Sequence, residues 1–163
     1  MMYEDDSSEG LGEEFGDFKG NRTVSDNVVQ VELVSFGFSF GQPKDTLKTY
    51  NLRSLPNPSK EIRKTSTGLH KQLQEQLFSI PDVITFFDAT IEELTNLLLT
   101  SNVSENISIG FGCHAGKHRS VAVVERVFSN LAKHENLKHF TFTVTHRDIE
   151  RSSKESKKDH RRK

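Results

Sequence analysis

The sequence predicts one α/β domain with a largely parallel sheet flanked by helices. Runs rich in β-branched and aromatic residues alternate with stretches whose apolar residues recur at helical spacing, which is typical of parallel sheets. The apolar run at 106–112 barely alternates with polar residues, so we expect a strand buried on both faces. A chain of 163 residues has room for one core but not for two.

Four strands are expected. The first, 28–40, contains Gly37, which indicates a bulge or a close approach of another backbone segment, and it ends before Pro43. The others are predicted at 47–52, 106–112 and 140–145.

Three helices are expected between these strands. They are predicted at 69–78, 83–100 and 119–134. Leu69 is placed on the apolar face of the first helix, and residues 60–66 are polar. Residues 53–58 contain Pro56 and Pro58 around an asparagine, so they form a fixed loop.

The two ends of the chain carry opposite charge. Residues 1–26 hold eight acidic residues against two basic ones, a net charge of −6, and we expect them to be disordered. The domain is predicted at 27–150, followed by a basic tail at 151–163, and residues 147–163 have a net charge of +4. Such a tail is compatible with RNA binding or nuclear import.

Composition favours a soluble cytoplasmic protein, with a nuclear location through the basic tail as the alternative. No apolar run reaches the length of a membrane span, and the N-terminus is acidic where a signal peptide would be basic. Cys113 is the only cysteine, so no disulfide can form within the chain.

The stretch 107–124 predicts an anion-binding loop between a strand and a helix. Gly112, Ala115 and Gly116 let the backbone curl so that several N–H groups converge. The N-terminus of the following helix is the positive end of its dipole and points into the same space. A run of three cationic donors is available, and its last member, Arg119, can hold a phosphate through two hydrogen bonds.

The same loop also reads Cys113-x-x-Gly116-x-x-Arg119-Ser120, the signature of cysteine-dependent phosphatases. A thiolate at Cys113 beside Arg119 could attack phosphorus, and Ser120 could help it leave. Catalysis by Cys113 and Arg119 is therefore the alternative to simple binding.

Two features weaken the phosphatase reading. Gly112 precedes the cysteine, where those enzymes usually have a histidine. The only candidate general acids are Asp45, Asp88 and Asp148, and each fits an ordinary turn, helix or tail position.

No metal or other cofactor is predicted. A histidine site would need His114, His118 and His146 to converge, and their spacing matches no known ligand pattern.

Five stretches together resemble the C-terminal domain of the RapZ (YvcJ) family over residues 28–155. They are 34–38, 52–58, Thr67-Gly68-Leu69, 112–121 and 146–151, and their order and spacing agree with that family. The bacterial members also carry an N-terminal P-loop kinase-like domain, which holds the nucleotide-binding activity. This chain shows no Walker A pattern, so we expect a standalone C-terminal domain.

The resemblance implies a sugar-phosphate site and a role as sensor or adaptor. It places the site on Cys113, His114, Gly116, Lys117, His118, Arg119 and Ser120, with Arg53 from the second stretch. Ala115 belongs to the same loop, and His146 and Arg147 end the last strand, where ligands bind in parallel sheets. The bacterial adaptor is implied to sense glucosamine-6-phosphate, to bind small RNA and to contact partner proteins.

Two positions depart from the family pattern. Phe40 replaces a histidine of the bacterial adaptor, and Asn51 replaces the usual aspartate before Leu52-Arg53. Both positions bear on how the sugar is held, so amino-sugar specificity is open. The expected function is binding of a phosphorylated small molecule, with RNA bound through the basic tail, a protein partner possible and no membrane contact.

Overall fold

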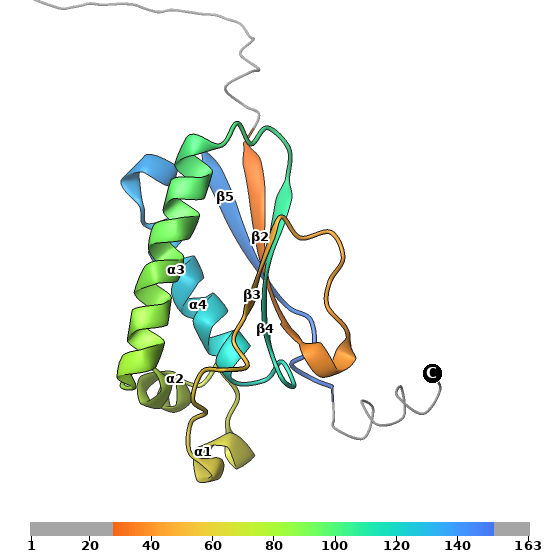
Figure 1. Cartoon of the computed structure of the whole chain (residues 1–163), viewed down its shortest axis with the longest axis vertical. Helices are drawn as coiled ribbons and strands as arrows, with labels where there is room; N and C mark the ends of the chain where they lie inside the picture. Colours follow the sequence, from red (N-terminus) through yellow and green to blue (C-terminus); the bar gives the residue numbers. More distant parts are fainter. Residues whose placement is uncertain (1–27, 152–163) are drawn as a thin grey trace, which may run out of the picture.

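The computed structural model describes residues 28–151, which contain four parallel strands (Figure 1). The sheet has the order β3-β4-β2-β5, and every pair of neighbours is parallel. The strands are β2 (Val29–Gly37), β3 (Lys48–Asn51), β4 (Ile107–Cys113) and β5 (Phe140–His146). The predicted α/β class with a parallel sheet is confirmed. The predicted acidic segment and nearly all of the basic tail lie outside the described residues.

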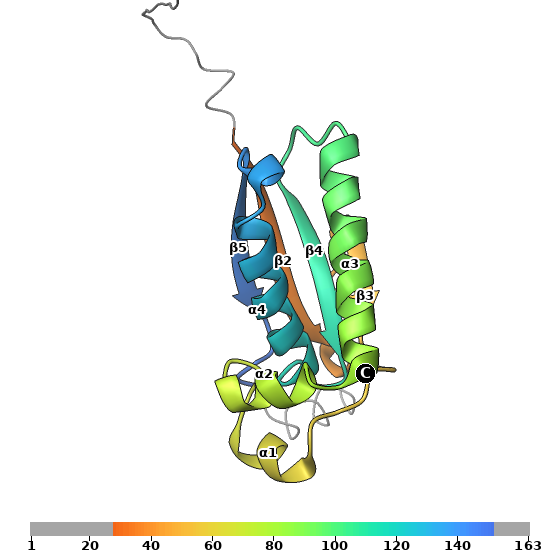
Figure 2. The same ribbon diagram turned by 90° about the vertical axis from the view of Figure 1, so that its left-hand side faces the viewer.

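The helices lie on one face and at one end of the sheet. They are α1 (Lys60–Thr65), α2 (Lys71–Leu77), α3 (Pro81–Thr100) and α4 (Arg119–Ala132), with 3-10 turns η2 (Phe38–Phe40) and η3 (Glu135–Leu137). Figure 2 shows α3 and α4 on the same face of the sheet, and α1 and α2 at the end toward which the strands point. Within residues 28–151, no helix is long and apolar enough to cross a membrane.

The core lies between the sheet and α3 and α4. Alternate residues of the strands enter it, including Val31, Leu33 and Phe111, and all are fully buried. The residues Val123, Val127 and Leu131 of α4 are also fully buried, as their helical spacing predicted. From Ile109 to Cys113 every residue of β4 is buried, which confirms the expectation of a strand covered on both faces.

Two expectations about local structure are wrong. The first strand ends at Gly37 rather than at 40, because the Ser39 N–H bonds to the carbonyl of His114 and η2 begins. Leu69 does not lie on a buried helical face: it precedes α2 and is 51% exposed. In addition, the polar stretch after Pro58 forms the short helix α1, whose first turn is capped by the Ser59 hydroxyl.

Candidate functional site

The loop between β4 and α4 crosses the end of β2 at van der Waals distance. Gly116 has φ +77°, and a Cβ atom there would lie 2.6 Å from the backbone nitrogen of Gly37. A Cβ on Gly37 would lie 2.4 Å from the carbonyl carbon of Ala115. Both positions need glycine, and Gly37 makes the close approach that the sequence predicted. This crossing sets the path of the loop at the carboxyl end of the sheet.

Helix α4 begins directly after this loop and lacks a side-chain cap. His118 is its N-cap residue and makes no side-chain hydrogen bond to the first turn. The first N–H groups of a 14-residue helix therefore carry no side-chain acceptor, and they form the positive end of the helix dipole. An anion at this position would be stabilised by both effects.

A pocket of about 270 Å³ lies at this helix start. Six of the predicted site residues line it: Cys113, His114, Ala115, Lys117, His118 and Arg119. Asn57 and Arg63 complete the lining from the segment that follows β3. Three lining residues are Lys or Arg, and none is acidic, so the pocket favours a negatively charged ligand.

Arg119 uses one of its amino groups to hold the protein together. Its Nη1 donates to the carbonyls of Leu52, Arg53 and Leu55, at 3.3, 2.9 and 2.8 Å. The side chain is 6% exposed, and its buried Nε has no hydrogen-bond partner among residues 28–151. Burial lowers the pKa of the guanidinium, and the nearby Cys113 opposes this shift. Arg119 thus fastens the end of β3 to the start of α4, and its Nε–H has no partner among the described residues.

Cys113 and Ser120 lie beneath the loop. The Cys113 thiol donates to the Ser120 hydroxyl at 3.1 Å, and the two residues are 3% and 0% exposed. None of the three candidate general acids lines the pocket. Asp148 is fully buried, and its carboxylate accepts from the Gly37 N–H at 2.8 Å and from the Arg147 guanidinium.

His118 connects the loop to α1. Its Nε2 lies 3.1 Å from the Arg63 carbonyl, which can only accept, so Nε2 carries the proton. Burial lowers the pKa of His118, and the positive charges of Arg63 and Lys117 lower it further. We therefore assign a neutral imidazole at pH 7, which links the two walls of the pocket.

The other predicted site residues lie at the same end of the sheet but do not line this pocket. Gly116 and Ser120 are buried, and they support the loop that lines the pocket. Arg53 is exposed, stacks 3.9 Å above the ring of Phe38 and donates from Nε to Asn51. Arg147 is held by Asp148 and by the Gly41 carbonyl.

His146 is engaged in the fold rather than in the pocket. Its Nδ1 lies 2.7 Å from the Ser35 hydroxyl, and its Nε2 lies 2.7 Å from the Glu125 carboxylate. This chain of hydrogen bonds ties β2, β5 and α4 together. Because Ser35 is fully buried, the triad-like arrangement has no exposed nucleophile. Within the described part of the chain, no group of three His, Cys, Asp or Glu residues is arranged to hold a metal ion.

The sequence reasoning missed Asn57 and Arg63. Asn57 stands between the two prolines of the fixed loop, which was the one available signal for a positioned polar side chain. Arg63 stood in a polar stretch with no helical pattern. Helix α1 positions its backbone, and the hydrogen bond from its Nε to the Pro58 carbonyl at 3.0 Å positions its side chain.

Comparison with known proteins finds similarity over most of the chain. Residues 29–150 match the family described as the RapZ C-terminal domain. A nucleotide-binding protein of Desulfitobacterium hafniense (strain DSM 10664 / DCB-2) is 35% identical over 156 residues, which cover 93% of this chain and 50% of that protein. Proteins with the same name from Mycobacteroides abscessus and Lactiplantibacillus plantarum are 36% and 32% identical, and the matches cover 76% and 79% of this chain. They cover 41% and 43% of those proteins, so the chain spans about half the length of these relatives or less.

Proposed function

The chain belongs to the RapZ C-terminal domain family, and on that premise we propose that the pocket at the start of α4 binds a small phosphorylated metabolite. One observation carries the proposal: Arg63, Lys117 and Arg119 line the pocket without any acidic residue, at a helix start that has no side-chain cap. The phosphoryl group would accept hydrogen bonds from the loop and from the first turn of α4.

A sugar phosphate is the class of ligand that we favour. The pocket volume of about 270 Å³ is close to the lower end of the range for small-molecule sites, about 300–1,000 Å³. The amide of Asn57 can both donate to and accept from sugar hydroxyls. The implied amino sugar, glucosamine-6-phosphate, is the first candidate. The relatives are named nucleotide-binding proteins, so a nucleotide is the competing ligand, although they are about twice as long as the matched region.

Binding in this pocket would suit a sensor or adaptor. Its lining comes from the segment after β3 and from the β4–α4 loop, and both Arg119 and His118 bond across to the first of these. A bound phosphate would therefore tie together the two segments and alter the surface around α1. RNA binding through the basic tail remains a prediction from the sequence.

Calorimetric titration tests the binding proposal. We expect glucosamine-6-phosphate and glucose-6-phosphate to bind more tightly than inorganic phosphate or a nucleoside triphosphate. Lys117→Gln should weaken sugar-phosphate binding about tenfold, equivalent to about 1.4 kcal/mol, because it removes a charge from the lining. The matched control is Lys64→Gln, at an exposed position of α1 outside the lining, which should leave the affinity unchanged. If none of these compounds binds, the proposal is wrong.

A cysteine-dependent phosphatase is the second candidate, because Cys113 and Arg119 line one pocket and the thiol is bonded to Ser120. In that reaction the Cys113 thiolate would attack phosphorus while the bond from phosphorus to the alcohol breaks, and the alcohol would take its proton from water. Water would then hydrolyse the S-phosphocysteine and release phosphate and the free thiol. The test is turnover of an aryl phosphate by the wild type and by Cys113→Ser. Turnover that disappears in the variant would make phosphatase catalysis the better supported function of the pocket. No turnover by the wild type would exclude phosphatase activity toward this substrate.

A further inference from the structure

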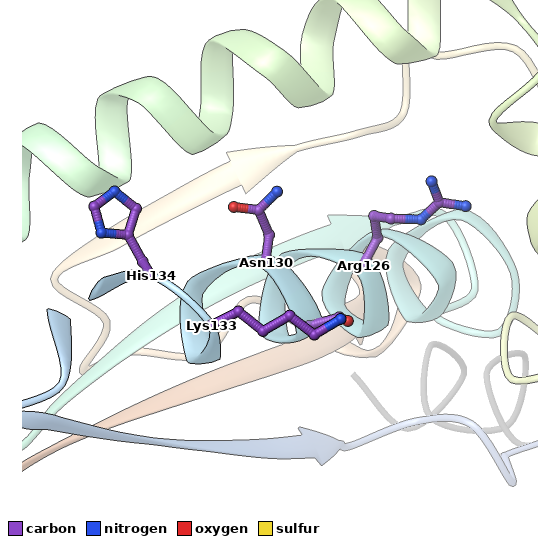
Figure 3. Close-up of a pocket in the computed structure, with 5 residues that line it drawn as sticks. Arg126, Asn130, Lys133 and His134 are labelled. Atoms are coloured by element: carbon purple, nitrogen blue, oxygen red, sulfur yellow. The ribbon is translucent and has the colours of Figure 1, made fainter. Parts of the chain in front are cut away.

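The outer face of α4 carries a second hollow, far along the helix from the pocket at its start. This cavity of about 390 Å³, the basic groove, is lined by Arg126, Ser129, Asn130, Lys133 and His134. Their spacing of three and four residues places them on one side of the helix. Figure 3 shows Arg126, Asn130 and His134 projecting in the same direction from α4.

The basic groove holds positive charge that the described residues do not neutralise. No acidic residue lines it. Lys48, Lys71 and Lys138 each pair with a glutamate, whereas neither Arg126 nor Lys133 forms an ion pair with any residue of 28–151. The Arg126 guanidinium lies 4.1 Å from the centre of the Phe78 ring, which holds this cation in place. The groove is therefore a fixed cationic surface without a partner in the described fold.

The topology brings the start of β2 close to the end of α4. Helix α4 leaves the carboxyl end of β4 and must return along the sheet, because β5 is parallel to the other strands. Helix α4, which Lys133 and His134 directly follow, therefore ends toward the end of the sheet where β2 begins (Figure 2). The chain after β5 leaves from the opposite end. The acidic segment thus joins the fold beside the basic groove, and the basic tail does not.

We propose that the basic groove of α4 docks the acidic segment, residues 1–26, of the same chain. The segment has a net charge of −6, opposite to that of the groove. Its length allows a reach of roughly 85 Å when extended, far more than the about 12 Å between Arg126 and His134 along the helix. Because the segment is tethered, its effective concentration at the groove is on the order of millimolar, so weak contacts suffice.

The groove suits a tethered carboxylate segment better than RNA. It lies on the C-terminal half of α4, where the negative end of the helix dipole weakens the binding of any anion, and RNA brings one phosphate with every nucleotide. Carboxylates spaced along a chain can pair with Arg126 and Lys133 singly, without contacts to the helix end.

Zero-length carbodiimide cross-linking of the full chain tests the proposal, because it joins a lysine only to a carboxylate in contact with it. At low protein concentration and low salt, we expect Lys133 to be linked to acidic residues between Glu4 and Asp17 in the monomer. Arg126→Gln should lower that yield about threefold, since it removes one of the cations that attract the segment, and high salt should abolish it. The matched control, Lys64→Gln, removes one charge at the other end of the fold and should leave the yield unchanged.

Several results would overturn the proposal. One is linkage of the segment to Lys117, or to lysines of the basic tail, instead of Lys133. Links found only between ¹⁴N- and ¹⁵N-labelled chains would show an intermolecular contact. If oligouridylate protects Lys133 against acylation, and no link to the segment is found, the groove binds RNA instead.

Discussion

At the scale of single residues, Arg119 shows how one side chain can support both fold and ligand. Its position in the sequence predicted that Arg119 binds a phosphate. Its Nη1 instead donates to three carbonyls of the turn at 52–55. Arginine carries five N–H donors in a fixed fork, so this use leaves donors on the other edge. The unpartnered Nε is consistent with a ligand that completes its hydrogen bonding.

Arg119→Lys should destabilise the protein by about 2 kcal/mol, because the lysine side chain ends one bond short of the position of Nη1 and leaves buried acceptors unpaired. Urea unfolding would measure the change. The matched control is Arg53→Lys, whose side chain is exposed and should shift stability by less than about 0.5 kcal/mol. Equal effects at both positions would mean that the three carbonyl bonds contribute little.

His118 makes stability depend on pH. Burial lowers the pKa of His118 in the folded protein below its value of about 6.5 in the unfolded chain. As pH falls, the unfolded state binds the proton first, so the contribution of His118 is complete above about pH 6.5 and is lost below it. Between about pH 7.5 and pH 5.5, the wild type should lose more stability than His118→Gln. The matched control for the substitution itself is His139→Gln, at an exposed position.

At the scale of elements, the end of β2 determines where the β4–α4 loop can lie. Gly37 and Gly116 bring two backbones together, and the buried Asp148 accepts from the Gly37 N–H beside this crossing. The Ser35–His146–Glu125 chain joins β2, β5 and α4. These contacts make the loop a rigid support, as a binding site requires.

Three alanine substitutions should separate the effect of steric contact on stability from the effect of backbone strain. Gly37→Ala introduces a clash at an ordinary φ of −109°, and Gly41→Ala introduces only strain, since φ is +92° and nothing lies within 4 Å. Gly116→Ala has both defects. We expect Gly116→Ala to lose the most stability, Gly37→Ala more than about 2 kcal/mol, and Gly41→Ala about 1–2 kcal/mol. Thermal unfolding gives the order, and a Gly37→Ala variant as stable as the wild type would show that the crossing can relax.

At the scale of the whole molecule, the pocket joins segments that are far apart in the sequence. Parallel strands bring their carboxyl ends to one edge, so the chain that follows β3 meets the loop that follows β4. Asn57 and Arg63 thereby reach a loop more than fifty residues further along. A ligand held by both segments would be a cross-link between them.

Hydrogen–deuterium exchange should detect that cross-link. We expect glucosamine-6-phosphate to slow exchange in residues 57–63 and 113–119 together, because a ligand that binds only the closed pocket suppresses local opening of both walls. Exchange in β5 should not change, since it contributes nothing to the lining. Protection of the loop alone would mean that Asn57 and Arg63 do not contact the ligand.

The sequence by itself determined the order of the four strands and of three of the four helices, and the parallel sheet, and it predicted an anion-binding role for the β4–α4 loop. These properties depend on local patterns: apolar periodicity, glycines next to a strand, and cations at a helix start. The same patterns misjudged the end of β2 and the position of Leu69, because neither signals where another segment will make contact.

Only the tertiary structure decided which donors line the pocket. It turned the Nη1 of Arg119 toward the turn at 52–55, engaged His146 and Arg147 in the fold, and brought in Asn57 and Arg63. The physical reason is that a buried polar group takes the partners that packing places beside it, and those partners come from distant parts of the chain.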